Sequence, residues 1–511
     1  MRQNHGVIAA GHRKTAEAGQ EMFALGGNAF DAAIASLCAA FVVEPTLTSA
    51  GGSGFLLAHP RAQPPMLFDF FSQTPRTKRP SNELDFYPVE LNFGGEVQTF
   101  HIGMGAIAVP GNLAGAFTVQ QRLGKLPFKE VVQPAIDYAK NGFEITSYQE
   151  FCLRLLEPIM LAQPESRKIF APQGKLLTAG EVCTMRNFAD TLTFLAQHGV
   201  EEFYQGEIAH RFVKDSQAGG GYLTLADLSN YRVIVRKPLQ THYRGYKLLT
   251  NPPPSAGGTL IALALKLLSA VNFTHIEFGS PRHLQILAQV MRLTNEARHN
   301  GYDASLDRED SAERFLSQSD PYQHRLKNFV NKWGSTTHIS VIDSEGNAAS
   351  TTTTNGEGSA YIIPDTGIMV NNMLGEADIN PFGFHNWMCD RRIASMMAPT
   401  LLLKQGKSAV VLGSGGSNRI RTAILQVISN LVDFELSLDE AVQSPRVHWE
   451  NNVLSVEPNR YQEAMAIADD TKLVLWPEKN MFFGGVHAVR GKKDGMEGAG
   501  DARRDGIAIL S

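Results

Sequence analysis

The sequence predicts an α/β (α+β) fold with a large buried core, and three observations support this prediction. The chain has 511 residues, of which 43% are hydrophobic and 19% charged, a globular composition. The first part of the chain reads mainly as helices with short apolar strands, and a β pattern begins after Thr336. Helices and strands that alternate in this way pack as layers around a shared core.

The N-terminal region predicts one strand and two helices. The apolar run Val7–Ala10 predicts a strand, and Thr15–Leu25 a helix. A second helix is predicted over Ala32–Val43, whose apolar residues suit a buried position. Because Glu44 precedes Pro45 and is disfavoured in the α region, this helix should end there.

The middle of the chain reads as mostly irregular, then helical. Residues 60–105 are largely polar apart from the apolar run Met66–Phe71. Residues 110–270 predict mainly helix, with proline and glycine clusters as breaks, and residues 259–300 predict two helices. The charged stretch 303–330 is expected to be an exposed segment that leads to a processing loop.

After Thr336 the chain predicts five strands and two helices. The run Gly413–Ser417 precedes an amphipathic helix with apolar residues on one face, and Ser437–Glu440 is a capping box that begins another. The predicted strands are Thr337–Ile342, Ala348–Thr354, Ile368–Val370, Thr400–Leu403 and Ala409–Leu412.

Thr336 stands at the start of a predicted strand, after a small-residue loop. If the chain is cut before it, its hydroxyl can attack a carbonyl while its freed α-amine accepts the proton. A free α-amine has a pKa of about 7.7–8.0, so part of it is neutral at neutral pH. A threonine-rich hairpin is also ordinary strand material, and the segment alone leaves both interpretations open.

Two further segments could bind charged groups. The run Gly413–Ser417 precedes a helix N-terminus, where successive backbone N–H groups can face an anion. It could be a phosphate loop, an oxyanion hole or simply a glycine-rich strand-to-helix turn. The Gly-Lys-Ser/Thr of a phosphate loop is missing. Carboxylates in Asn371–Asp378 could bind a substrate ammonium or form a solvated turn, and Arg391–Thr400 offers cations and a hydroxyl for a carboxylate.

Charge and cysteine content argue against several function classes. The net charge is −4 without a basic block, so nucleic acid is not an expected partner. Cys38, Cys152, Cys183 and Cys389 are far apart and show no metal-ligand spacing, which predicts free thiols and neither a disulfide framework nor a metal site.

The longest apolar stretch, residues 32–43, is too short to cross a membrane, and no secretory signal is evident. We expect a cytoplasmic protein without a membrane partner, or a periplasmic one if a leader has been removed.

An ordered set of motifs closely resembles the γ-glutamyltranspeptidase family (glutathione hydrolases) of N-terminal-nucleophile hydrolases. The resemblance covers nearly the whole chain. Its signatures are Gly26–Ala33, Val42–Pro45, Val109–Gly111, Tyr243–Tyr246, Pro252–Gly258, Thr336–His338 and Gly484–Val486.

The resemblance implies a four-layer αββα sandwich formed by two subunits from one precursor. The chain would cleave itself between Ser335 and Thr336, giving a large subunit of residues 1–335 and a small subunit of residues 336–511. Thr336 would take the acyl group of a γ-glutamyl amide such as glutathione and pass it to water, an amino acid or a peptide. No cofactor is implied.

The resemblance also implies roles for residues around Thr336. Thr353 and Asn355 resemble the hydroxyl and amide beside the nucleophile, and residues i and i+2 of a strand share a face. Thr354 is the alternative to Thr353 if the register differs, because this segment is one residue shorter than the family pattern. Gly416 and Ser417 resemble the pair whose N–H groups form the oxyanion hole.

Two residues resemble the substrate-binding groups of the family. Glu376 resembles the acid that holds the substrate α-ammonium, and Ser395 resembles a hydroxyl near the α-carboxylate. Both groups would act on the glutamyl headgroup.

Several residues depart from the family pattern in or near the headgroup pocket. Phe71 stands where the family has an arginine for the α-carboxylate, and a phenylalanine cannot donate those hydrogen bonds. Arg76 or Arg79 could replace that arginine. Met373 and Met396 also stand where the family has polar residues. The alternatives are therefore an amidase of the same fold with another acyl donor, or a homologue that neither cleaves nor catalyses.

Overall fold

The computed structural model describes residues 5–92, 97–298, 302, 311–317, 335–380, 382–465, 471–492 and 495–511. Two antiparallel sheets form its centre. The first has the order β22 (Ile507–Leu510), β1 (Gly6–Ala10), β11 (Thr337–Asp343), β12 (Ala348–Thr354), β2 (Ser53–His59), β3 (Met66–Phe70) and β8 (Ile234–Arg236). The second has the order β21 (Gly495–Ala499), β20 (Gly485–Lys492), β16 (Lys407–Gly415), β15 (Thr400–Lys404), β10 (Tyr246–Thr250) and β9 (Leu239–Tyr243).

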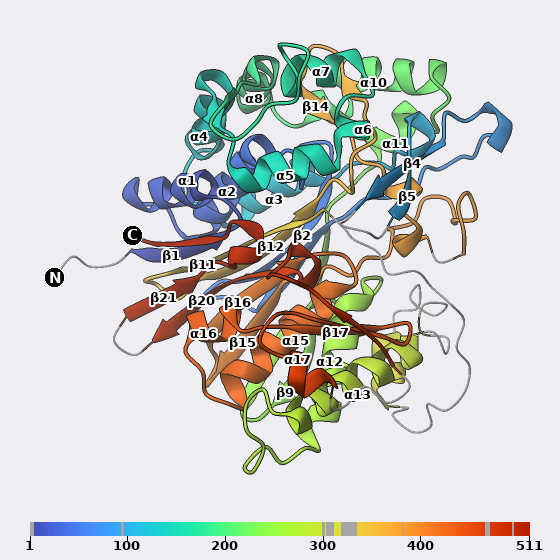
Figure 1. The fold of residues 1–511 in the computed structure, drawn as a ribbon. Helices are drawn as coiled ribbons and strands as arrows, with labels where there is room; N and C mark the ends of the chain where they lie inside the picture. Colours follow the sequence, from blue (N-terminus) through green and yellow to red (C-terminus); the bar gives the residue numbers. More distant parts are fainter. Residues whose placement is uncertain are drawn as a thin grey trace.

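Helices cover the outer face of each sheet (Figure 1). The helices on the first sheet are α1 (Arg13–Ala24), α2 (Ala29–Val43) and α3 (Asn112–Leu123), with α4 (Phe128–Asn141) packed on α2. Those on the second are α12 (Ala256–Ser269), α15 (Arg419–Val432) and α16 (Leu438–Gln443), with α13 (Pro281–Ala297) beside α12. The result is the four-layer αββα sandwich expected from the resemblance.

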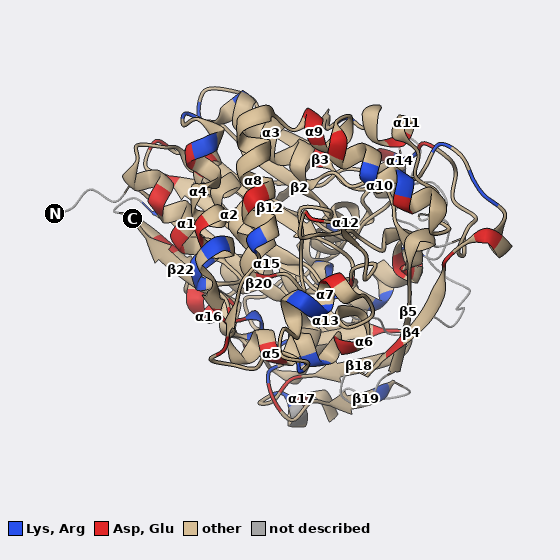
Figure 2. Ribbon diagram, turned by 90° about the horizontal axis from the view of Figure 1, so that it is seen from above, with Lys and Arg blue, Asp and Glu red and all other residues tan. Residues whose placement is uncertain are grey.

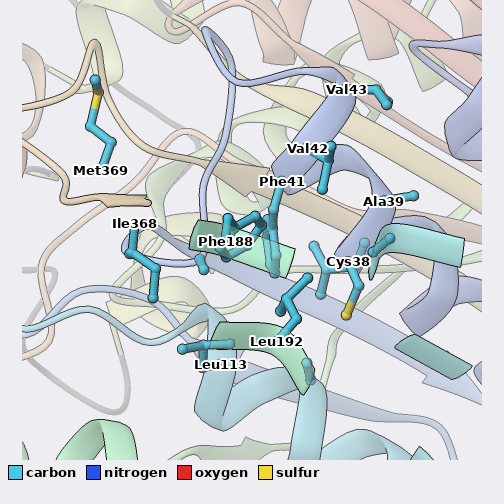
Figure 3. Close-up of a cluster of buried hydrophobic side chains, with 14 of the residues drawn as sticks. Cys38, Ala39, Phe41, Val42, Val43, Leu113, Phe188, Leu192, Ile368 and Met369 are labelled. Carbon is cyan, nitrogen blue, oxygen red and sulfur yellow. The ribbon is translucent and has the colours of Figure 1, made fainter. Parts of the chain in front are cut away.

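Helix α2 fixes the position of the first sheet. Its start is a capping box: the Asn28 side chain accepts the N–H of Asp31, and the Asp31 carboxylate accepts the N–H of Asn28. Every residue of α2 is buried. Phe41 packs with Leu113 of α3 and with Phe188 of α8 (Arg186–His198) in the cluster shown in Figure 3. This core holds α2 against β11 and β12.

The remaining elements form a helical region beyond α2 and smaller sheets. The helices of that region are α5 (Ser147–Leu155), α6 (Glu157–Met160), α7 (Pro164–Phe170), α9 (Glu201–Tyr204), α10 (Glu207–Ala218) and α11 (Leu225–Ser229). On the other side of the molecule, α14 (Ser311–Ser317) packs on α12, and α17 (Tyr461–Met465) packs on α13. The strands are β4 (Tyr87–Asn92) with β5 (Val97–Ile102), β6 (Phe143–Glu144) with β7 (Val182–Cys183), β13 (Ile362–Ile363) with β14 (Ile368–Met369), and β17 (Val447–Glu450), β18 (Val453–Val456) and β19 (Lys472–Leu475).

The structure corrects several predicted elements. Residues 60–105 contain the β4–β5 hairpin besides β3, and residues 110–270 contain strands β8 to β10. Helix α2 begins at Ala29 and not at Ala32, and β16 continues through Gly415 into the predicted glycine turn. In the predicted exposed segment, residues 303–310 and 318–330 lie outside the described residues.

In the ribbon of Figure 2, segments with Lys or Arg are interspersed with segments with Asp or Glu. All four cysteines have free thiols; three are buried and Cys389 is exposed. The described residues contain no cluster of three His, Cys, Asp or Glu side chains suited to a metal ion. No helix in the described part of the chain is long and apolar enough to cross a membrane.

Candidate active site

Thr336 lies at the head of β11, between the two sheets. Along β11, Ile339 and Val341 belong to the core under α2, whereas His338 and Ser340 point to the second sheet. Because side chains alternate along a strand, Thr336 shares the inter-sheet face with His338. Thr336 is 5% exposed, so the predicted nucleophile is buried in the uncleaved chain.

Three hydrogen bonds hold Ser335 immediately before the predicted cleavage point. The Thr354 hydroxyl donates to the Ser335 carbonyl oxygen at 2.5 Å. The Ser335 N–H donates to one carboxylate oxygen of Glu357 at 3.1 Å, and the Ser335 hydroxyl to the other at 2.5 Å. The peptide group that would be cut is therefore fixed on its carbonyl side.

The structure places Thr354, and not Thr353, beside this peptide group. Thr353 pairs with Thr337 across the hairpin, and both point away from the second sheet. The Thr353 hydroxyl lies 2.8 Å from that of Thr48 and donates to Asn112 Oδ1 at 3.1 Å. The contacts thus favour the alternative register, and a role for Thr353 stays a prediction.

The predicted oxyanion loop lies next to Thr336 on the second sheet. A Cβ on Gly415 would stand 2.0 Å from the Thr336 carbonyl oxygen, so only glycine permits this approach. Gly416 has φ +119° and Ser417 φ +49°, and the Arg419 N–H bonds back to the Gly416 carbonyl. The N–H groups of Gly416 and Ser417 thus stand where β16 turns into α15.

Arg504 connects Thr336 to a buried ionic network. Its guanidinium donates to the Thr336 carbonyl at 3.1 Å. The neighbouring Arg503 binds both Asp501 and Glu457, and Asp501 also binds Arg446 at 2.6 Å. Despite burial, the arginines hold the pKa of Asp501 well below its usual range. This network fixes the loop that carries Arg504.

The predicted substrate-binding residues fall into two places. Asn355 is 2% exposed, and its amide nitrogen and oxygen have no hydrogen-bond partner among the described residues. A Cβ on Gly356 would lie 2.0 Å from Glu376 Oε1, so Glu376 lies against the same turn. Ser395 instead contacts the start of α12: its carbonyl accepts the Ser255 hydroxyl, and its own hydroxyl accepts the Met397 N–H.

The departures from the family pattern meet in one apolar cluster between the sheets. Phe71, Met373 and Met396 all belong to it. The Phe71 ring stacks on the Phe55 ring, with 5.2 Å between the ring centroids. Phe71 directly follows β3, at the end of the sheet where Thr354 also lies. The position of the expected arginine is therefore apolar.

The arginines considered as replacements are bound elsewhere. Arg76 pairs with Asp390 at 3.2 Å. Arg79 donates to the carbonyls of Gln217 and Gly221. Neither contact places a guanidinium at Phe71.

Three residues near Thr336 had no catalytic or binding role predicted from the sequence: Glu44, Glu357 and Arg504. Glu44 belongs to a family signature, and its carboxylate accepts the hydroxyls of Thr15 and Thr337, each at 2.6 Å. Glu357 follows Asn355 by two residues, so proximity in sequence could have suggested it. Arg504 is 168 residues from Thr336, and no local pattern indicates the contact.

We expect Glu44→Gln to remove one contribution to stability that decreases as the pH rises. Burial raises the Glu44 pKa from 4.5 to about 7, against the hydrogen bonds from Thr15 and Thr337. Glu44 therefore binds more protons in the folded protein than in the unfolded chain between these values, so its own contribution to stability falls as pH rises from 4.5 to about 7. At about 1.4 kcal/mol per pKa unit the effect is a few kcal/mol.

Urea unfolding at pH 5 and pH 7.5 measures this effect. Glutamine keeps both threonine contacts, because hydroxyls can accept as well as donate. Burial also raises the pKa of Glu357 to about 7 and lowers the pKa of His448 and His487 to about 4, so the variant keeps the pH dependence that these groups contribute. If the free energy of unfolding changes between pH 5 and pH 7.5 by the same amount in Glu44→Gln as in the wild type, the raised pKa of Glu44 is wrong.

The fold and the buried threonine at the head of a central strand are those of an N-terminal-nucleophile hydrolase. The chain belongs to the γ-glutamyltranspeptidase family, whose model (Gamma-glutamyltranspeptidase) matches residues 15–511.

Curated relatives carry two kinds of name. The chain is 32% identical over 528 residues to acylase ACY 1 proenzyme of Pseudomonas sp. (strain SE83), covering 99% of this chain and 93% of the relative. It is 31% identical over 507 residues to glutathione hydrolase 2 of Arabidopsis thaliana, covering 92% and 86%. The glutathione hydrolase proenzyme of Escherichia coli (strain K12) is 30% identical over 498 residues, covering 89% and 83%.

Solved structures share the fold. Cephalosporin acylase from Bacillus halodurans has a TM-score of 0.84 at 24% identity, covering 99% of this chain and 96% of that one. Helicobacter pylori γ-glutamyltranspeptidase has a TM-score of 0.52 at 29% identity, covering 61% and 91%.

Proposed function

We propose that the chain is a self-processing amide hydrolase and acyltransferase whose nucleophile is Thr336. The observation that carries this proposal is the fixed Ser335–Thr336 peptide group. The Thr354 hydroxyl donates to the Ser335 carbonyl, and the Arg504 guanidinium donates to the Thr336 carbonyl. The Thr336 hydroxyl attacks the Ser335 carbonyl carbon, a C–O bond forms, and the C–N bond breaks. The hydroxyl proton goes to the departing amine, and water then hydrolyses the ester.

The interleaved sheets support two subunits that stay together, residues 1–335 and 336–511. In the first sheet, β1 of the large part lies between β22 and β11 of the small part. In the second, β10 of the large part pairs with β15 of the small part. A cut at 335/336 would break neither pairing. The relatives named as proenzymes agree with such processing.

In turnover, the freed α-amine takes the Thr336 hydroxyl proton as the hydroxyl attacks the donor carbonyl. The N–H groups of Gly416 and Ser417 would stabilise the developing oxyanion. The donor C–N bond then breaks, and the departing amine takes the proton from the α-ammonium. The acyl group of the resulting ester passes to water or to the amine of an amino acid or peptide, which frees the Thr336 hydroxyl. γ-Glutamyl amides such as glutathione are the first donor class, supported by Asn355, Glu376 and the glutathione hydrolases among the relatives.

A second candidate is an amidase with a different acyl donor. The apolar cluster around Phe71 favours it, because the Phe71 side chain offers no cation to a glutamyl α-carboxylate, and the nearby Arg392 guanidinium is bound to the Phe71 carbonyl and to Asp69. The similarity to acylase ACY 1 over 99% of the chain supports the same view. In either case the acyl-enzyme on Thr336 is the same.

Anilides of four acyl groups separate the candidates: γ-glutamyl, glutaryl (without the ammonium), 4-aminobutyryl (without the carboxylate) and butyryl (without both). For a γ-glutamyl donor, loss of the ammonium should lower kcat/KM at least about tenfold. Butyryl turnover equal to γ-glutamyl turnover would support the second candidate. A processed protein that hydrolyses none of the anilides would contradict acyl transfer.

A further inference from the structure

Glu357 makes a two-point contact with the acyl half of the bond that would be cut. One carboxylate oxygen accepts the Ser335 N–H, and the other accepts the Ser335 hydroxyl. Glu357 is 2% exposed, and its own N–H donates to Asn372 Oδ1 at 2.9 Å. The carboxylate is thus held in place by the backbone and aimed at Ser335.

Self-cleavage and turnover acylate the same oxygen. In self-cleavage the Ser335 carbonyl carbon bonds to the Thr336 hydroxyl, so Ser335 is the first acyl group that the site holds. A donor substrate must later bring its carbonyl carbon to that hydroxyl. The two hydrogens that Glu357 accepts are borne by nitrogen on the carbon next to the carbonyl, and by oxygen one carbon further away.

We propose that Glu357 forms an acyl-donor subsite that Ser335 occupies in the precursor and vacates after scission. The subsite selects donors with an ammonium, N–H or hydroxyl on the carbon next to the scissile carbonyl, which are α-aminoacyl and α-hydroxyacyl amides. The inference rests on acyl transfer by Thr336. It builds on the second candidate function, an acyl donor other than γ-glutamyl, because a γ-glutamyl group carries only a methylene at that carbon.

The surroundings of Glu357 suit a donor of hydrogen bonds, charged or neutral. The backbone of Asn355 forms an isolated β-bridge with Glu357 in the same turn. The side-chain amide nitrogen and oxygen of Asn355 both lack a hydrogen-bond partner among the described residues. The Asp378 carboxyl group and the Arg504 guanidinium also lie near Glu357. Arg504 is bound to the Thr336 carbonyl, opposite the acyl side.

The test uses three anilides that differ in one substituent: alanyl (α-ammonium), lactyl (α-hydroxyl) and propionyl (α-methylene). With the processed wild-type protein we expect kcat/KM for alanyl to exceed that for propionyl by about 10- to 100-fold, with lactyl between them. A propionyl value equal to or above the alanyl value would overturn the proposal. This comparison needs no variant.

Glu357→Gln adds a second arm. It should slow scission and bring the alanyl-to-propionyl ratio toward 1, mainly through the alanyl donor. Glu44→Gln is the matched control: the same change in an equally buried carboxyl on the opposite face of the sheet should leave the ratio unchanged. A wild-type ratio retained in Glu357→Gln would also refute the subsite.

Failure of the subsite differs from failure of the proposed function. If the chain cleaves at 335/336 and hydrolyses propionyl anilide as fast as alanyl anilide, only the subsite is wrong. If it neither cleaves nor hydrolyses any anilide, acyl transfer by Thr336 is wrong.

Discussion

Thr336→Ala is expected to abolish both chain scission and turnover. The same hydroxyl is the nucleophile in both reactions, and alanine has none. The variant should run as one full-length chain on a denaturing gel and show no anilide hydrolysis above background. Thr336→Ser, which keeps a hydroxyl, should retain some of each activity.

Thr351→Val is the matched control for this substitution. Thr351 lies on the neighbouring β12, is fully buried, and its hydroxyl has no partner among the described residues. Valine has nearly the same shape, so folding and scission should be normal. Cleavage at 335/336 in Thr336→Ala would refute a shared nucleophile.

Thr354→Val is expected to slow scission by about 100-fold, the loss typical of one donor to a developing oxyanion. The Thr354 hydroxyl donates to the Ser335 carbonyl oxygen, where negative charge develops as Thr336 attacks. Valine keeps the shape and removes the donor. The rate is measured by following the appearance of the small subunit on gels after synthesis.

Thr353→Val makes the comparison direct, because it is the same change one residue earlier on the opposite face of β12. Its hydroxyl contacts Thr48 and Asn112, so its loss should affect stability more than scission. If Thr353→Val slows scission and Thr354→Val does not, the family-derived position is correct and the geometric reading is wrong.

The sequence predicted the elements with strong local signals. The threonine-rich hairpin β11–β12 was placed within a residue because its residues favour a pleated, buried strand. The β4–β5 hairpin was not predicted, because β4 is mostly exposed and lacks a clear apolar alternation. Strands β9 and β10 were not predicted either. Arg244 and Gly245, with φ +42° and +82°, form the two-residue hairpin turn between them.

Sequence motifs suggested candidate site residues, whereas contacts that only the fold creates could not be predicted. Glu376 lies against the turn that follows Asn355, and the roles predicted for both residues stay predictions. The choice between Thr353 and Thr354 depends on the pairing of β11 with β12, which sequence alone does not fix. Arg504 reaches Thr336 only because β20 and β16 bring the last loop under β11.

Intact mass and N-terminal sequencing of the purified, active wild-type protein test the central claim most directly. Under denaturing conditions we predict two chains, the smaller beginning at Thr336, with masses that together exceed the uncleaved chain by one water. Full activity in a preparation whose chain is uncut between Ser335 and Thr336 would contradict the account.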